Sequence, residues 1–247
     1  MKSFAIILRK GGSGKTTTAV NLATAIHQKG KRVLLVDLDP QANATLCVGI
    51  DPTKLEYNIN NLFNSIDIGP KDVITTTSFG LDILPSHPDL ANTEVGMKAT
   101  QIGVLKGLLE PIEPNYDFII VDTPPSESYL TVSALVYANE VIIPIQTHFL
   151  ALQGLRQAIT SIEQMKKGLN PKLKIRGILP TMVNQRSNIS KEVLEQLNLH
   201  YKDMLFPVKI DYSVKHPEST LAGIPIVLYA PEHSGAIAYN TLAGLLI

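Results

Sequence analysis

The chain has 247 residues, 45% of them apolar and 18% charged, and its 22 Lys and Arg residues balance 22 Asp and Glu residues. No apolar run reaches the roughly 20 residues that a membrane-spanning helix needs, and no signal-peptide pattern precedes the first apolar segment. The one cysteine, Cys47, excludes an intrachain disulfide, and two copies of the chain still lack enough cysteines to ligate an iron–sulfur cluster. These features predict one soluble, cytoplasmic domain that spans residues 1–247.

The first two predicted elements are a strand and a helix joined by a glycine-rich loop. Residues 3–8 form a short apolar run, typical of a strand that is buried on both faces of a parallel sheet. After the loop, apolar residues at three- and four-residue spacing predict a helix that packs one face on this sheet and ends at Gly30. These apolar residues are Ala19, Leu22, Ala23 and Ile26.

The connecting loop has the composition of a phosphate-binding site. Its glycines let successive backbone N–H groups turn toward one centre, and the helix N-terminus adds partial positive charge. We expect Lys15 to reach the β- and γ-phosphates of a nucleotide, the Thr16 hydroxyl to coordinate Mg2+, and Thr17 to cap the α-phosphate. A plain turn between strand and helix is the alternative, which the strand–loop–helix order disfavours. The expected nucleotide contacts are Lys10, Gly11, Gly12, Ser13, Gly14, Lys15, Thr16 and Thr17.

A second lysine distinguishes this loop from the ordinary form. The ordinary loop has a glycine where this chain has Arg9, and Lys10 then begins a Lys-Gly-Gly-Ser-Gly-Lys-Thr-Thr run. This run resembles the deviant Walker A motif of the ParA and MinD superfamily of dimeric ATPases. The resemblance implies that Lys10 crosses to the nucleotide of a facing subunit, so that two chains enclose two ATP molecules and each supplies a catalytic charge in trans. The alternative is a solvated loop lysine.

Two aspartates lie at the end of the next predicted strand, within residues 31–40. Asp37 and Asp39 are two positions apart, so an extended chain directs both to one face at the carboxyl end of the strand, where open α/β sheets bind ligands. Carboxylates there can order Mg2+ and position a water molecule. The resemblance implies that Asp39 orients the hydrolytic water and that Asp37 supports the magnesium shell. An Asp-Pro turn that happens to follow a strand is the alternative.

A third acidic residue ends the apolar run of residues 117–122. Asp122 stands where a Walker B aspartate belongs and is expected to hold the metal through water. Thr123, Pro124 and Pro125 then form a stiff switch loop, since proline fixes φ and cannot extend a strand ladder. The three motifs occur in the order of the ParA and MinD family, and the resemblance covers nearly the whole chain.

The remaining pattern alternates strands with helices, as a doubly wound α/β sheet does. It predicts a mostly parallel sheet with helices on both faces, which is the P-loop NTPase architecture of the deviant Walker type. Residues 51–80 are more polar and only weakly patterned. Further strands are expected at residues 81–85, 140–145 and 173–182, and helices at residues 97–110, 128–138, 151–167, 189–199 and 234–246.

Positive charge is concentrated in residues 164–216, which hold ten Lys or Arg and four Asp or Glu residues. In the ParA branch, the resemblance places DNA-binding basic residues at the positions of Arg186 and Lys215. A solvated face is the alternative for Arg186 and Lys215, and it is the more typical interpretation of a run of five other basic residues. The family's later basic residues are missing from residues 229–233, which makes DNA binding the weaker part of the assignment. No base-reading element is evident, so any DNA binding should be nonspecific and strongly salt-dependent. The five are Lys166, Lys167, Lys172, Lys174 and Arg176.

The resulting hypothesis is a ParA-type partition ATPase with ATP and Mg2+ as cofactors. An ATP-bound homodimer binds nonspecific DNA of the nucleoid, and a separate ParB-like or cargo-adaptor protein stimulates slow hydrolysis and release. The cargo is a plasmid, a chromosome or another large body such as a carboxysome. A MinD-like membrane-cycling ATPase is the main alternative, but residues 236–247 lack the Lys and Arg with which interfacial helices bind anionic lipid, so no stable membrane association is expected. A scaffold that hydrolyses almost no ATP is a third alternative, disfavoured by Asp39 and Asp122.

Overall fold

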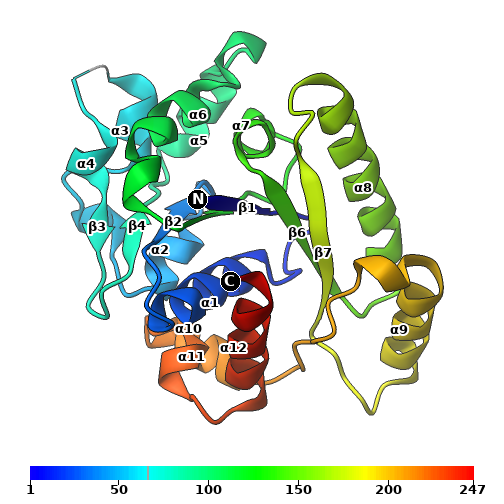
Figure 1. Cartoon of the computed structure of the whole chain (residues 1–247). Coiled ribbons are helices and arrows are strands. Elements are labelled where there is room, and N and C mark those ends of the chain that lie inside the picture. Colours follow the sequence, from blue (N-terminus) through cyan, green and yellow to red (C-terminus); the bar gives the residue numbers. More distant parts are fainter. Residues whose placement is uncertain (66) are drawn as a thin grey trace.

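A central β-sheet organises the chain in a computed structural model that describes residues 1–65 and 67–247 (Figure 1). Within these residues the sheet has seven strands in the order β3-β4-β2-β5-β1-β6-β7. Neighbouring strands are parallel, except that β3 pairs antiparallel with β4 at one edge. The strands are β1 (Lys2–Ile6), β2 (Val33–Asp37), β3 (Thr75–Thr76), β4 (Asp82–Leu84), β5 (Phe118–Asp122), β6 (Glu140–Gln146) and β7 (Lys174–Thr181).

Helices cover both faces of the sheet (Figure 1). Among the described residues, no helix has both the length and the hydropathy that crossing a bilayer requires. The helices are α1 (Lys15–Gln28), α2 (Asn43–Cys47), α3 (Ile59–Asn64), α4 (Pro70–Val73), α5 (Leu90–Gly96), α6 (Val104–Leu109), α7 (Tyr129–Tyr137), α8 (Ala151–Gly168), α9 (Asn188–Tyr201), α10 (Lys215–Leu221), α11 (Ile226–Tyr229) and α12 (Ser234–Leu246).

Alternate residues of the central strands enter two hydrophobic cores. In β5, Phe118 and Ile120 belong to the core that contains residues of α1 and α12, whereas Ile119 and Val121 belong to the core that contains residues of α7 and α8. Every residue of β5 is buried. Because both faces are covered, such strands are continuous apolar runs in the sequence rather than alternating ones.

The carboxyl ends of β1, β2 and β5 meet at one edge of the sheet. Ile6 of β1 and Asp37 of β2 are both register partners of Asp122 on β5. β1 lies between β5 and β6, where the strand order reverses, and open α/β sheets bind ligands in the crevice at such a point. The fold therefore brings the phosphate loop and the acidic strand ends together.

The α/β fold predicted from the sequence is confirmed, but the single helix expected at residues 97–110 is wrong. In its place, α5 ends at Gly96, a 3-10 turn covers Ala99–Gln101, and α6 begins only at Val104. Gly96 ends α5 and Gly103 immediately precedes α6, and glycine lowers helix stability by about 1 kcal/mol relative to alanine. The weakly patterned residues 51–80 contain α3, α4 and the edge strand β3.

Candidate active site

The phosphate loop turns sharply between β1 and α1 because two of its glycines adopt a left-handed backbone. Gly12 has φ +70° and Gly14 has φ +87°, values that side chains with a Cβ rarely adopt. Gly14 immediately precedes α1, and its carbonyl oxygen accepts a hydrogen bond from Thr18 N at 2.9 Å. The loop therefore ends on a helix N-terminus, as an anion site requires.

Two polar side chains from β6 and β7 hold this loop in place, and the sequence analysis did not identify them. Gln146 Nε2 donates to the Gly12 carbonyl oxygen. Thr181 Oγ1 donates to the Ser13 carbonyl oxygen at 2.9 Å. Both residues are the last of their strands, so the same edge of the sheet that carries the acidic groups also fixes the loop. The sequence does carry one indication of these residues, because each is a polar residue at the end of an apolar strand.

The two lysines of the loop have different environments. Lys15 is only 6% exposed, and its Nζ donates to the Lys10 carbonyl oxygen at 3.2 Å. Burial lowers the pKa of Lys15, while the charges of Asp122 and Asp39 act in the opposite direction. Lys10 is partly exposed, and its amine forms no ion pair within the described residues.

Asp122 is a buried carboxyl group without a partner. It is fully buried, and neither of its oxygens accepts a hydrogen bond within the described part of the chain. Burial, followed by the charge of Asp37, raises the pKa of Asp122 well above its ordinary value. The Thr16 hydroxyl, which approaches this carboxyl group without the geometry of a formed hydrogen bond, and the charge of Lys15 oppose part of this rise.

This environment fits a hydrated magnesium ion beside the phosphates of a nucleotide. Buried polar atoms are normally hydrogen-bonded, so the two free oxygens of Asp122 mark a place for a ligand. Together with the Thr16 hydroxyl they supply the hard oxygen atoms that Mg2+ prefers. When bound, the metal would neutralise charge on the β- and γ-phosphates.

Asp37 and Asp39 are held in different ways. Asp37 is fully buried, its Oδ1 accepts from Asp39 N at 3.1 Å, and its Oδ2 accepts from Thr45 N and Thr45 Oγ1, both at 2.8 Å. Burial raises the pKa of Asp37 to about 7, and these hydrogen bonds oppose the rise. Asp39 lies beyond the end of β2 in a turn, where its Oδ1 accepts from Gln41 N at 2.9 Å. The turn, rather than strand alternation, therefore places Asp39.

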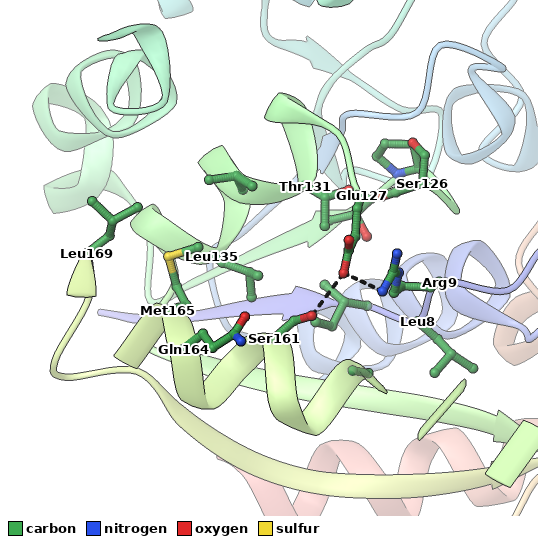
Figure 2. A pocket seen from close by; sticks show the side chains of 15 residues that line it. Leu8, Arg9, Ser126, Glu127, Thr131, Leu135, Ser161, Gln164, Met165 and Leu169 are labelled. Atoms are coloured by element: carbon green, nitrogen blue, oxygen red, sulfur yellow. Dashed lines mark hydrogen bonds and ion pairs between the residues drawn. The ribbon is translucent and has the colours of Figure 1, made fainter. Parts of the chain in front are cut away.

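An ion pair joins Arg9, the residue before Lys10, to Glu127, which follows the switch loop (Figure 2). Arg9 Nη1 lies 2.6 Å from Glu127 Oε1, and Ser161 Oγ of α8 donates to the same oxygen at 2.9 Å. The pair borders a cavity of about 420 Å3 between β1, α7 and α8. Both side chains are well exposed, so the pair adds little stability. It does connect the residue before Lys10 to the segment that follows Asp122.

A second cavity, of about 290 Å3, opens beside Gly14 and Thr17. Its lining includes the rings of Tyr212, His216 and Tyr239. Burial lowers the pKa of His216 to about 4, so its imidazole is neutral at pH 7. A cavity with neutral aromatic rings next to a phosphate loop suits a nucleobase.

Similarity to known proteins agrees with this geometry. An AAA-domain family profile matches residues 1–175, which include the phosphate loop, the acidic strand ends and the switch loop. Soj, a sporulation initiation inhibitor protein of Bacillus subtilis, is 40% identical over 98% of this chain and 96% of its own length. The chain belongs to the ParA/MinD superfamily of P-loop ATPases.

Two further relatives match this ParA/MinD superfamily member over nearly its whole length. The chromosome partitioning protein ParA of Caulobacter vibrioides is 36% identical over 98% of this chain and 92% of its own. A solved structure named cobyrinic acid a,c-diamide synthase, from Mycobacterium smegmatis with a bound ATP analog and magnesium, is 33% identical and has a TM-score of 0.85. That match covers 100% of this chain and 94% of the other. The superfamily fold is thus shared from end to end.

The two basic residues that the ParA resemblance singles out lie in adjoining loops. The loop with Arg186 follows β7 and runs beside the segment before Lys215, where Tyr212 N donates to the Val183 carbonyl oxygen at 2.9 Å. Arg186 is exposed. Lys215 Nζ lies 2.6 Å from Glu218 Oε2, so a neighbouring carboxylate offsets its charge.

The run of five other basic residues lies at the opposite edge of the sheet. Lys174 begins β7, whereas Arg186 follows its far end, and eight strand residues span roughly 25 Å. Arg176 donates to the Leu245 carbonyl oxygen at 2.9 Å. In this superfamily member, the run therefore does not extend the surface around Arg186 and Lys215.

Replacing Asp122 with asparagine is expected to raise the free energy of unfolding of the nucleotide-free protein at pH 8 by about 1–3 kcal/mol. The substitution removes a buried charge that lacks hydrogen bonds. With a raised pKa, the folded chain keeps this proton to a higher pH than the unfolded chain does. The stability contributed by proton binding is complete below the ordinary aspartate pKa of about 4 and is lost as the pH rises through the raised pKa. Melting curves between pH 5 and 8 should show the advantage of Asp122→Asn growing with pH.

Asp117→Asn is the matched control for this measurement. Arg32 holds the pKa of Asp117 at about 2, so this variant should lose a little stability over the same pH range instead of gaining it. Addition of Mg2+ and ATP should raise the melting temperature of the wild-type protein more than that of Asp122→Asn. An Asp122→Asn protein that is less stable than wild type at pH 8 without nucleotide contradicts the assignment of an unpaired charge.

Proposed function

We propose that the chain is an ATP-dependent partition ATPase. In this proposal Mg2+ and ATP close a sandwich dimer, the dimer binds nonspecific DNA, and a separate partner protein stimulates hydrolysis and release. The observation that carries the nucleotide part is Asp122, whose two buried oxygens have no hydrogen-bond partner and lie near Thr16 and Lys15. This is the arrangement that a metal-bound nucleoside triphosphate would complete.

Each residue of the site has a task in the proposed reaction. The loop N–H groups and Lys15 bind the phosphates, and Thr16 and Asp122 hold Mg2+. Asp39 orients a water whose oxygen bonds to the γ-phosphorus while the bond to the bridging oxygen breaks, which yields ADP and phosphate. Lys10 of a second copy approaches the γ-phosphate and offsets the charge that develops there. Each site is complete only in the dimer, so dimerisation and ATP turnover are coupled.

The partition role is supported by the names and the coverage of the relatives. The chain is 36% identical to a chromosome partitioning protein over 92% of that protein's length, and 40% identical to Soj. Its identity to the protein named as a diamide synthase is lower, at 33%. DNA binding is supported by Arg186 and Lys215, because dimerisation would place both copies of this pair on one particle and raise the local positive charge.

Arg186→Ala is expected to weaken binding of the Mg2+- and ATP-loaded protein to a short nonspecific duplex. The slope of log K against log salt should fall in magnitude by about 2, one phosphate contact for each copy in the dimer. Lys215→Ala should have a smaller effect, since Glu218 already offsets that charge. Glu218→Gln should strengthen binding for the same reason. Fluorescence anisotropy over a salt series measures all three.

Lys172→Ala provides the control, because Lys172 is exposed in the basic run at the opposite edge of the sheet. The DNA affinity of Lys172→Ala and its dependence on salt concentration should match those of the wild-type protein. Equal losses from Lys172→Ala and Arg186→Ala would contradict the assigned DNA surface. A wild-type protein that fails to bind DNA with Mg2+ and ATP at moderate salt would contradict the proposed function itself.

A further inference from the structure

A closed ring of hydrogen bonds links the two aspartates at the end of β2 to the end of β4. Asp39 N donates to Asp37 Oδ1 at 3.1 Å, and Thr45 Oγ1 donates to Asp37 Oδ2 at 2.8 Å. Ser86 N donates to Thr45 Oγ1 at 3.0 Å, and Ser86 Oγ closes the ring by donating to the Asp39 carbonyl oxygen at 2.8 Å. Asp37, Thr45 and Ser86 are fully buried, and Asp39 is 6% exposed. Bonds of this kind, shielded from water, fix the positions of the groups they join.

The ring engages both carboxylate oxygens of Asp37. Its Oδ2 also accepts from Thr45 N at 2.8 Å, so three donors converge on this one side chain. Asp122, the neighbouring carboxylate in the sheet register, has none. The adjacent acids therefore differ in their roles: Asp122 is open to a ligand, whereas Asp37 holds the backbone from which Asp39 projects.

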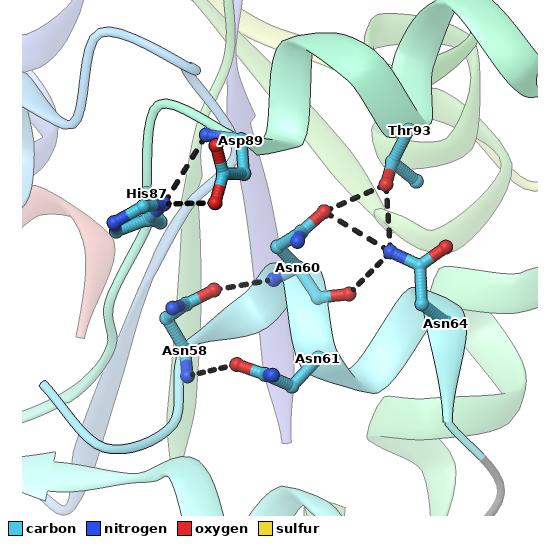
Figure 3. Close-up of polar contacts among 7 residues, drawn as sticks. All are labelled: Asn58, Asn60, Asn61, Asn64, His87, Asp89 and Thr93. Carbon is cyan, nitrogen blue, oxygen red and sulfur yellow. Dashed lines mark hydrogen bonds and ion pairs between the residues drawn. The ribbon is translucent and has the colours of Figure 1, made fainter.

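Ser86 is in turn supported by the helices on either side of it. The residue before it, Pro85, accepts a hydrogen bond from Ile59 N at the start of α3, at 2.9 Å. The helix after it, α5, is joined to α3 by Thr93 Oγ1, which donates to Asn60 Oδ1 at 2.6 Å (Figure 3). The Ser86 hydroxyl thus projects from a braced segment, as a group that positions a catalytic side chain should.

We propose that Ser86 and Thr45 are positioning residues for Asp39, holding it in the place from which it orients the attacking water. This inference rests on the proposed ATPase function. Ser86 fixes the Asp39 carbonyl, Thr45 fixes Asp37 and through it the Asp39 N–H, and Gln41 N orients the Asp39 carboxylate. A displacement of about 1 Å at a reacting group can lower a rate by about a hundredfold. Loss of the ring should therefore slow hydrolysis without loss of the phosphate contacts.

Three variants separate the links of the ring. Ser86→Ala removes one bond only, since Ser86 N still donates to Thr45 and Ala42 N still donates to the Asp39 carbonyl oxygen at 2.8 Å. Thr45→Val keeps the side-chain shape but removes the hydroxyl and so breaks two bonds. Thr45→Ser restores the hydroxyl. We expect hydrolysis to fall about tenfold in Ser86→Ala and about a hundredfold in Thr45→Val, and to recover most of its rate in Thr45→Ser.

Single-turnover hydrolysis with saturating Mg2+ and ATP measures these rates, and an equilibrium titration measures ATP affinity in parallel. ATP affinity should change by less than about twofold, because the variants leave the phosphate loop intact. Ser133→Ala is the matched control: Ser133 of α7 is also fully buried, and its hydroxyl also donates to a backbone carbonyl, that of Tyr129. It should hydrolyse ATP at the wild-type rate.

A double variant distinguishes positioning from general loosening of the fold. If Ser86 acts through Asp39, adding Ser86→Ala to Asp39→Ala should lower the residual rate no further. A Ser86→Ala protein with the wild-type rate, a further tenfold loss in the Asp39→Ala background, or an equal loss of ATP affinity would each overturn the positioning role. Absence of ATP hydrolysis in the wild-type protein would overturn the proposed function instead.

Discussion

Replacing Lys10 with alanine is expected to abolish ATP-dependent dimers and to lower ATP hydrolysis by about a thousandfold, the scale of a charge supplied in trans to phosphoryl transfer. The folded monomer should be unaffected, because Lys10 is partly exposed and its amine forms no ion pair in the described chain. Light scattering gives the particle mass with Mg2+ and ATP, and phosphate release gives the rate. Lys29→Ala, at an exposed lysine after α1, should match wild type in both.

A mixing experiment tests whether Lys10 acts on the facing subunit. Lys10→Ala and Asp39→Ala proteins should each be inactive alone. In a mixed dimer, the nucleotide bound to the Lys10→Ala chain keeps its own Asp39 and receives Lys10 from the Asp39→Ala chain. The mixture should therefore regain part of the wild-type rate. A mixture as inactive as its two components, or ATP-dependent dimers of the Lys10→Ala protein alone, would contradict action in trans.

Asp39→Ala is expected to slow hydrolysis by about a hundredfold to ten-thousandfold, the range for loss of a general acid or base, while ATP binding persists. Gln41 N holds this carboxylate, and in the proposed reaction the carboxylate orients the attacking water. The ATP-bound dimer should accumulate and remain on DNA longer than the wild-type dimer. Phosphate release and the dissociation rate from a labelled duplex measure the two effects.

Asp203→Ala is the control for that substitution, since Asp203 is exposed in a 3-10 turn after α9. It should hydrolyse ATP and leave DNA at the wild-type rates. If Asp39→Ala protein turned ATP over as fast as wild type, Asp39 would not be the residue that orients water. Loss of ATP binding in that variant would instead assign Asp39 to the nucleotide contacts.

The parts of the site that could be predicted from the sequence are the strands and the polar residues that directly follow them. Residues 4–8, 33–36 and 118–121 are continuous apolar runs, which is what burial on both faces of a parallel sheet selects. The polar groups after each run then had to meet at one edge of the sheet, and the structure brings Asp37 and Asp122 into register. Gly96 and Gly103 stand at the two ends of the break in the helix expected at residues 97–110, where the low helix propensity of glycine outweighs the apolar spacing.

The contacts that hold the site together were not predictable from local pattern. Gln146 and Thr181 support the phosphate loop from more than a hundred residues away, and Ser86 reaches Asp39 across 47 positions. Each of these residues lies at or just after the carboxyl end of a strand. Only the order of the strands in the sheet brings such residues close together, and the local sequence pattern does not give that order. The pairing of Lys215 with Glu218 is an i,i+3 contact on α10, a helix that the sequence analysis did not identify.

Binding to a short nonspecific DNA duplex, measured with Mg2+ and ATP, with Mg2+ and ADP, and without nucleotide at one moderate salt concentration, tests the central claim most directly. An ATP-gated partition protein should bind tightly with ATP and weakly or not at all in the other two states, because in the proposed cycle only the closed dimer joins both copies of Arg186 and Lys215. Equal binding in all three states, or none in any, would contradict the account.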